Sequence, residues 1–168
     1  MFVLDPNPVK AAQFLCDAHV RVICREVTML LSSWYSWNIP GMKPLLSYKP
    51  MNENQPLALQ MVYTPVRRWA FQYAGAVFDE FEFRFGKSHA SRIRYSVLAS
   101  LIEQFDPGIV YGRPQVRFTF VAKGDGVFPG QTMSQAVRLY RLYYLSKLSK
   151  MKVPAIWTSR SKPIWTDF

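Results

Sequence analysis

Apolar residues recur every three or four positions over residues 8–33, which is the spacing of the buried face of an α-helix. Asn7 followed by Pro8 is typical of an N-cap and a first helical position. Ser32 and Ser33 weaken the pattern at its other end. Because apolar residues cover more than half of its circumference, we expect this helix to be central in the fold.

Two further helices are predicted in the middle of the chain. Thr64-Pro65 is a second start signal and Gly86 a stop signal, which together predict a helix over 64–85. A third helix is predicted over 88–105, where Asp106-Pro107-Gly108 ends the pattern.

Charged residues on these helices suggest different roles. Arg67 and Arg68 lie in a first helical turn, which the helix dipole disfavours, so they are candidates for serving a ligand. Glu80 and Arg84 are four residues apart, and we expect a structural salt bridge between them. A basic run follows the helix, namely Lys87, His89, Arg92 and Arg94.

The last third of the chain combines extended and helical patterns. Residues 109–131 look extended, because Val116, Phe118 and Phe120 alternate with polar residues. A capping box, Thr132-Met-Ser-Gln135, then predicts a helix over 132–151. We therefore expect a mainly α fold: residues 1–168 as a single helical domain of three to four long helices, irregular aromatic-rich connections and at most a short β hairpin.

The connection over 34–56 is predicted to be irregular, because four prolines and a glycine exclude a long helix. It carries two Trp, two Tyr and two Lys. These side chains can stack on bases or simply lie across the core. Trp157 and Trp165, near the end of the chain, are expected to be docked anchors.

The first predicted helix contains an unusual polar cluster over residues 17–26. On a helical wheel at about 100° per residue, Asp17, Arg21 and Arg25 form a ladder that can pair along one face. His19 and Glu26 fall together on another face, within an arc of apolar residues: Leu15, Cys16, Val22, Ile23 and Leu30. Such a pair either serves chemistry, because pKa values shift in apolar surroundings, or is a satisfied pair that only fixes packing.

The net charge of the chain indicates the kind of partner rather than the fold. The 168 residues carry 21 Lys+Arg against 11 Asp+Glu, a formal net charge of +10. This excess favours an anionic partner, with nucleic acid first and a membrane surface as the competitor. The sequence lacks the roughly 18 consecutive apolar residues of a membrane-spanning helix, and no signal peptide is recognised. Cys16 and Cys24 suit neither a disulfide nor a metal site, so a reduced, cytoplasmic location is expected.

Several enzyme classes lack their motifs here. There are only two His, His19 and His89, and no HExxH, so metal hydrolysis is poorly supported. The P-loop, dinucleotide and G-x-S-x-G motifs are missing too, and no cofactor or metal is expected. The first-helix cluster remains. A carboxylate flanked by Arg can act as general acid or base, or stabilise the cation that develops on a sugar during glycosidic cleavage.

The run Cys16-Asp17-Ala18-His19, followed after five residues by Arg25-Glu26, resembles the first helix of the bacteriophage pyrimidine-dimer DNA glycosylase/AP lyase family. The segment Glu80–Lys87 is similar to an acidic-then-Arg-Gly-aromatic segment of that family. The chain also resembles a family of uncharacterised phage and large-DNA-virus proteins at Asn54-Gln55-Pro56 and Tyr140–Tyr144. In the glycosylase family an N-terminal Thr supplies an amine that forms an imine with the sugar. Here Met1 precedes the bulky Phe2, and Met29 stands where that family has another Arg.

The resemblance implies a base-processing enzyme of the phage type that acts on modified or damaged double-stranded DNA. By position, the resemblance implies Glu26 as the key carboxylate and His19 and Arg25 as DNA contacts. The expected catalytic set is Glu26, His19 and the α-amine of Met1. The expected nucleic-acid contacts are Arg21, Arg25, Arg84, Lys87, Arg92, Arg138, Arg141, Tyr144 and Lys147. Two alternatives stay open: a non-catalytic basic nucleic-acid-binding or host-takeover phage protein, and a virion or assembly protein that binds a protein partner.

Overall fold

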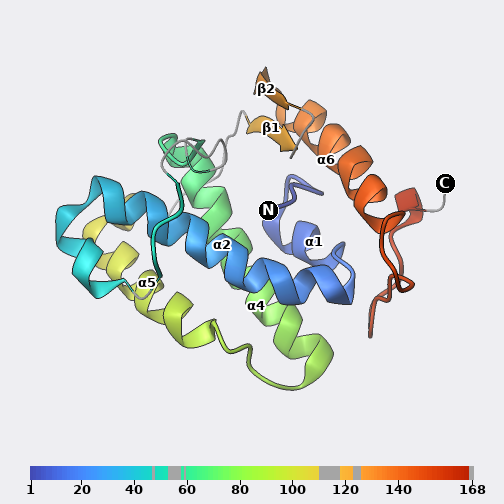
Figure 1. Cartoon of the computed structure of the whole chain (residues 1–168), viewed down its shortest axis with the longest axis horizontal. Helices are drawn as coiled ribbons and strands as arrows, with labels where there is room; N and C mark the ends of the chain where they lie inside the picture. The colour runs from blue at the N-terminus through green and yellow to red at the C-terminus, as the bar shows by residue number, and fades with distance from the viewer. Residues whose placement is uncertain (47, 53–57, 59, 110–117, 123–125, 167–168) are drawn as a thin grey trace.

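The computed structural model describes residues 1–46, 48–52, 58, 60–109, 118–122 and 126–166, and for 118–122 and 126–131 the backbone alone. The α-helices are α1 (Pro8–Gln13), α2 (Asp17–Asn38), α4 (Thr64–Phe85), α5 (Arg92–Phe105) and α6 (Met133–Leu148). Short 3₁₀ turns are η1 (Pro40–Leu45), η2 (Pro107–Ile109) and η3 (Ile164–Thr166). The strands β1 (Phe118–Ala122) and β2 (Gly126–Gln131) pair as an antiparallel hairpin. The predicted mainly α fold is confirmed (Figure 1).

The first predicted helix is broken, which corrects the expectation of one helix over 8–33. Asn7 does cap α1, since its Oδ1 accepts from the backbone N–H groups of Val9 and Lys10. The break lies between Gln13 and Asp17. There the carbonyl oxygens of the chain accept hydrogen bonds from distant side chains instead of continuing the helical ladder.

Two residues from distant segments hold this break. The Arg84 guanidinium donates to the carbonyl oxygens of Gln13 and Leu15, at 2.9 and 2.8 Å. Trp157 Nε1 donates to the carbonyl of Phe14 at 3.1 Å. Because these donors come from α4 and from the C-terminal tail, the break is a tertiary feature that local helical periodicity does not report.

Helix α2 runs further than predicted, to Asn38, so residues 34–38 are helical rather than irregular. Ser33 is tolerated because its hydroxyl donates to the carbonyl of Met29 four residues earlier. Tyr35 is fully buried, and Trp34 and Trp37 pack against the core. For these rings the core-covering interpretation is correct. Residues 47 and 53–57 of the same connection lie outside the described part.

The other helices follow their sequence signals closely. Helix α4 has the predicted bounds, and Gly86 ends it with a left-handed φ of 61°. Helix α6 begins with the predicted Thr132/Gln135 capping box and ends at Leu148, three residues early. Helix α5 begins at Arg92 rather than at residue 88. The intervening residues form a turn in which the Ser91 N–H donates to His89 Nδ1 at 3.0 Å.

The core lies around α2 and α4, which cross in the middle of the molecule (Figure 1), with α1 packed on α4. The N-terminal segment, residues 1–4, is buried beside α2. On that side α6 and the C-terminal tail flank it, while α5 lies on the opposite side. Trp165 contacts Phe14 and Tyr144 edge-on, so the predicted anchoring of the tail is confirmed.

A buried ionic network joins α2, α4 and the tail. Arg84 Nε donates to Glu80 at 2.6 Å, which confirms the predicted pair, and Arg84 also binds Asp17 at 3.0 Å. Arg160 binds the second oxygen of Glu80, and Thr158 donates to Asp17. Asp17 is thus tied to α4 and the tail, and not to the expected ladder along α2.

Candidate active site and basic groove

The α-amine of Met1 lies 3.1 Å from Oε1 of Glu26, within ion-pair distance. The amine is held there because the first four residues are apolar and buried, with Val3 and Leu4 fully so. The Met1 side chain is 0% exposed, whereas that of Glu26 is 37% exposed. The Glu26 carboxylate therefore pairs with an amine of a buried segment, while part of its own side chain is exposed to solvent.

His19 occupies the same region, from the first turn of α2. Its Nδ1 lies 3.1 Å from the hydroxyl of Tyr144 and 3.1 Å from Sγ of Cys16. The Tyr144 oxygen accepts from the Cys16 N–H at 2.7 Å, which leaves its own proton to donate to the imidazole. Burial raises the pKa of Tyr144, so this donor keeps its proton. Phe2 packs edge-on against the His19 ring.

The surroundings of His19 favour the neutral form of its imidazole. Burial lowers its pKa, the Glu26 carboxylate opposes that shift, and the Lys147 ammonium and the Met1 amine lower the pKa further. With Nδ1 accepting, the proton of the neutral ring resides on Nε2. An amine, a carboxylate and a neutral imidazole thus act on one another electrostatically in one region of the protein.

The expected His19/Glu26 pair is therefore two linked sites rather than one ion pair. His19 bonds to Tyr144 and Cys16, and Glu26 bonds to the Met1 amine. The arrangement supplies a nucleophilic nitrogen and a carboxylate to exchange protons with it. One member of the predicted apolar arc, Val22, is instead 59% exposed.

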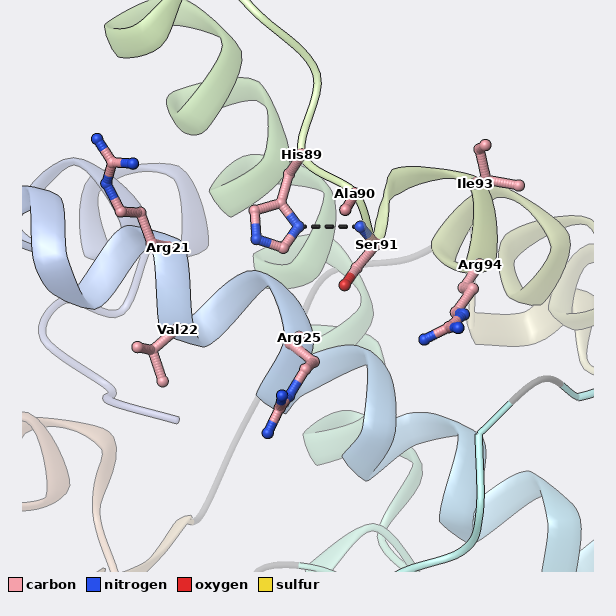
Figure 2. Close-up of a pocket in the computed structure, with 8 residues that line it drawn as sticks. All are labelled: Arg21, Val22, Arg25, His89, Ala90, Ser91, Ile93 and Arg94. Carbon is pink, nitrogen blue, oxygen red and sulfur yellow. Dashed lines mark hydrogen bonds between the residues drawn. The ribbon is translucent and has the colours of Figure 1, made fainter.

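A basic groove borders the same helix (Figure 2). It has a volume of about 660 Å³ and lies between α2 and the turn that leads into α5. It is lined by Arg21, Val22, Arg25, His89, Ala90, Ser91, Ile93 and Arg94. This set, called the basic groove below, contains three arginines and no acidic residue.

The other side chains predicted to contact nucleic acid differ in their surroundings. Lys87 and Arg138 are exposed, and Lys147 is half-buried with its ammonium 4.8 Å from the Tyr143 ring centre. Arg92 is half-buried and pairs with Asp79 at 3.1 Å.

Two predicted contacts, Arg84 and Tyr144, are corrected by burial, and a third, Arg141, has partners within the protein. The Arg84 side chain is 0% exposed and is bonded within the α2, α4 and tail network. Tyr144 is fully buried and bonds to Cys16 and His19. Arg141 donates to the carbonyl of Leu4 and lies above the rings of Phe14 and Trp165. These three residues hold the fold together around the site.

The suggestion that Arg67 and Arg68 serve a ligand is also corrected. Arg67 is buried, donates to the carbonyl oxygens of Met61 and Val62, and stacks on Trp34 at 3.8 Å. Arg68 donates to the carbonyl of Gly108. Both guanidiniums satisfy backbone groups of the structure.

Two members of the basic groove, Arg94 and His89, are not named among the predicted contacts, although the basic residues of the 84–94 segment were expected to hold the DNA backbone. Both belong to the basic run after α4, so the signal was present in the sequence. What the sequence did not show is that the turn into α5 lies against Arg21 and Arg25. No group of three potential metal ligands occurs within the described residues.

No described helix has the length and apolar character needed to cross a membrane. Comparison with known proteins found no matching family model, no similar curated protein and no similar solved structure.

Proposed function

We propose that this protein is a DNA-base-processing enzyme in which the Met1 α-amine is the nucleophile and Glu26 the proton-exchanging carboxylate. The observation that carries the proposal is the 3.1 Å separation of the Met1 nitrogen and Glu26 Oε1.

The proposed reaction begins with removal of a proton from the Met1 ammonium by Glu26. The neutral nitrogen attacks C1′ of a deoxyribose, and the bond between C1′ and the base breaks with its electron pair leaving on the base, which takes up the proton held by Glu26. The sugar opens as a proton moves from the Met1 nitrogen to the ring oxygen, which gives a protonated imine between Met1 and C1′. The Glu26 carboxylate then takes a C2′ proton, the 3′ phosphate leaves by β-elimination, and water hydrolyses the imine and releases the protein. At an abasic sugar, the aldehyde and the amine form the same imine with loss of water.

The positive charge supports nucleic acid as the substrate. The net charge is +10, and the groove with three arginines adjoins the helix that carries Glu26. Nucleic-acid binding through phosphates depends on such unpaired cations. His19 is proposed to orient the base or sugar through its Nε2–H group, because its Nδ1 is already engaged by Tyr144.

The test is strand cleavage of a DNA duplex with one abasic site, compared between the wild-type protein and Glu26→Gln. The proposal predicts nicking by the wild type and a loss of about 100-fold or more in the variant. Wild-type cleavage by Glu26→Gln would refute it. Mass spectrometry of the intact protein checks that Met1 carries a free amine.

A second candidate function is non-catalytic nucleic-acid binding, and the acid-free basic groove favours it as well. This candidate predicts duplex binding without any cleavage, and no effect of Glu26→Gln beyond a change in stability. The same comparison therefore separates the two functions.

A further inference from the structure

The arginines of the basic groove differ from other arginines of the chain in their partners. Five other guanidiniums of the described residues bind carboxylates: Arg67 with Asp106, Arg84 with Glu80 and Asp17, Arg92 with Asp79, Arg141 with Asp5, and Arg160 with Glu80. Within the described part, Arg21, Arg25 and Arg94 have no such ion pair. No described carboxylate therefore pairs with these three charges, and a concave surface lined without an acidic residue concentrates their potential.

Aromatic rings hold two of these guanidiniums in place. Arg21 lies 4.0 Å above the centre of the Phe85 ring, and Arg94 lies 4.8 Å above that of Tyr48. Tyr48 is itself fixed, because its hydroxyl donates to Ser91 Oγ at 2.9 Å. A cation held on a ring keeps its charge and loses less freedom on binding than a mobile one.

The start of α5 adds a partial positive charge to the groove. Ser91, Ile93 and Arg94 line the groove, and α5 has neither a side-chain cap nor an acidic residue in its first turn. The Ser91 hydroxyl accepts from Tyr48 and makes no hydrogen bond to the backbone of the first helical turn. A helix N-terminus without an acid favours an anion, and here it acts together with the three guanidiniums.

We infer that the basic groove binds a backbone phosphate of the DNA strand whose sugar is presented to Glu26. The inference rests on the nucleic-acid partner of the proposed function and adds Arg94 and the Tyr48-supported turn to it. Arg25 immediately precedes Glu26, and Val22 lies one helical turn before it, so the groove adjoins the carboxylate. The exposed Val22 and Ile93 side chains flank the cations and offer apolar contact to deoxyribose.

The test measures binding to a short duplex that contains a tetrahydrofuran abasic analogue, which has no aldehyde and cannot form an imine. Arg94→Gln and Arg25→Gln are compared with Lys10→Gln, which removes one exposed charge from α1, outside the groove. Each groove variant should weaken binding about tenfold, the effect of one lost charge-assisted hydrogen bond. Each should also reduce the slope of log affinity against log salt by about 1, whereas Lys10→Gln should change neither.

A second measurement uses inorganic phosphate as the probe and follows the NMR signals of the arginine Nε–H groups. Signals of Arg21, Arg25 and Arg94 should shift on titration, and those of the buried Arg84 should not. Groove variants that bind the duplex like Lys10→Gln would overturn the inference. So would a groove dependence seen with phosphatidylserine vesicles but not with DNA.

These measurements test phosphate binding by the basic groove independently of the proposed catalysis. Groove-dependent binding without cleavage of an abasic duplex would refute the proposed catalysis and leave the phosphate site standing. Cleavage with no groove dependence of binding would do the reverse.

Discussion

The Met1 nitrogen and the Glu26 carboxylate, 25 residues apart in the chain, meet at 3.1 Å because the N-terminal segment is buried beside α2. The apolar side chains of residues 1–4 anchor this segment, and the amine is carried with it. Glu26 is the more exposed partner of this contact, since its side chain is 37% exposed and that of Met1 is 0% exposed.

Glu26→Gln should separate activity from stability. A partly exposed ion pair contributes about 0–1 kcal/mol, so the free energy of unfolding should change by no more than that. Affinity for the tetrahydrofuran duplex should stay within about twofold, because glutamine keeps the shape of the side chain. Thermal unfolding measures the change in stability, and fluorescence anisotropy measures the affinity for the duplex. A large loss of stability would instead make the contact a structural one.

Stability should fall in two steps as the pH is lowered. Burial lowers the pKa of both His19 and His89. The unfolded chain therefore takes up protons first below about pH 6.5, and stability decreases there. Urea unfolding at a series of pH values measures this step. It should be smaller in a protein with His19→Gln and His89→Gln, and an unchanged step would contradict the assignment.

The second step should occur below about pH 4.5, where carboxylates in the unfolded chain are protonated. Burial alone raises the pKa of Asp17 and Glu80, but hydrogen bonds from Thr158 and Arg84 to Asp17, and from Arg160 and Arg84 to Glu80, outweigh it and lower both. Their stabilising effect is present above this range and is lost below it. Asp17→Asn should reduce the second step and leave the first unchanged.

Arg84→Met should destabilise the protein by about 3–5 kcal/mol, because it leaves buried carboxylates short of a partner. It also removes the donors to the carbonyl oxygens at the break between α1 and α2. Arg160→Met is the matched control, since its side chain is 31% exposed and should cost less. Equilibrium urea unfolding gives both values. Equal losses of unfolding free energy in the two variants would mean that the contacts of Arg84 stabilise the fold no more than those of Arg160.

Tyr144→Phe should raise the pKa of His19 toward its ordinary value, because it removes a donor that favours the neutral ring. It should also cost about 1–3 kcal/mol, since the Cys16 N–H loses its acceptor. Tyr95→Phe is the matched control. It also removes a hydroxyl from a buried tyrosine, but that hydroxyl donates to the Phe71 carbonyl rather than to His19. NMR titration of the His19 ring measures the shift. An unchanged pKa would show that Tyr144 does not set the protonation of His19.

The sequence predicted those elements whose boundaries are encoded locally. Thr64-Pro65, Gly86 and the Thr132/Gln135 capping box each act within one helical turn, and α4 and the start of α6 fall where these signals place them. The break between α1 and α2 could not be found in this way. Its backbone groups are satisfied by Arg84 and by residues of the tail, and no local pattern reports such long-range bonds.

The sequence predicted part of the candidate site. Helical spacing brought His19 and Glu26 to one face, but their partners come from other elements. Tyr144 lies on α6 and Met1 at the N-terminus, so the spacing within α2 could not show that each residue has its own contact. Arg21 and Arg25 were predicted as contacts, but the sequence could not show that they share a groove with Arg94, because the groove forms only when the turn before α5 packs against α2.

The central claim, that the Met1 amine is the nucleophile, is tested most directly by reductive trapping. The protein is incubated with an abasic duplex and sodium borohydride, which reduces an imine to a stable secondary amine. Peptide mass spectrometry then locates the bond. The account predicts a covalent DNA adduct on the α-nitrogen of Met1, and its loss in a protein acetylated at that amine. No adduct, or an adduct confined to lysine side chains, would contradict the claim.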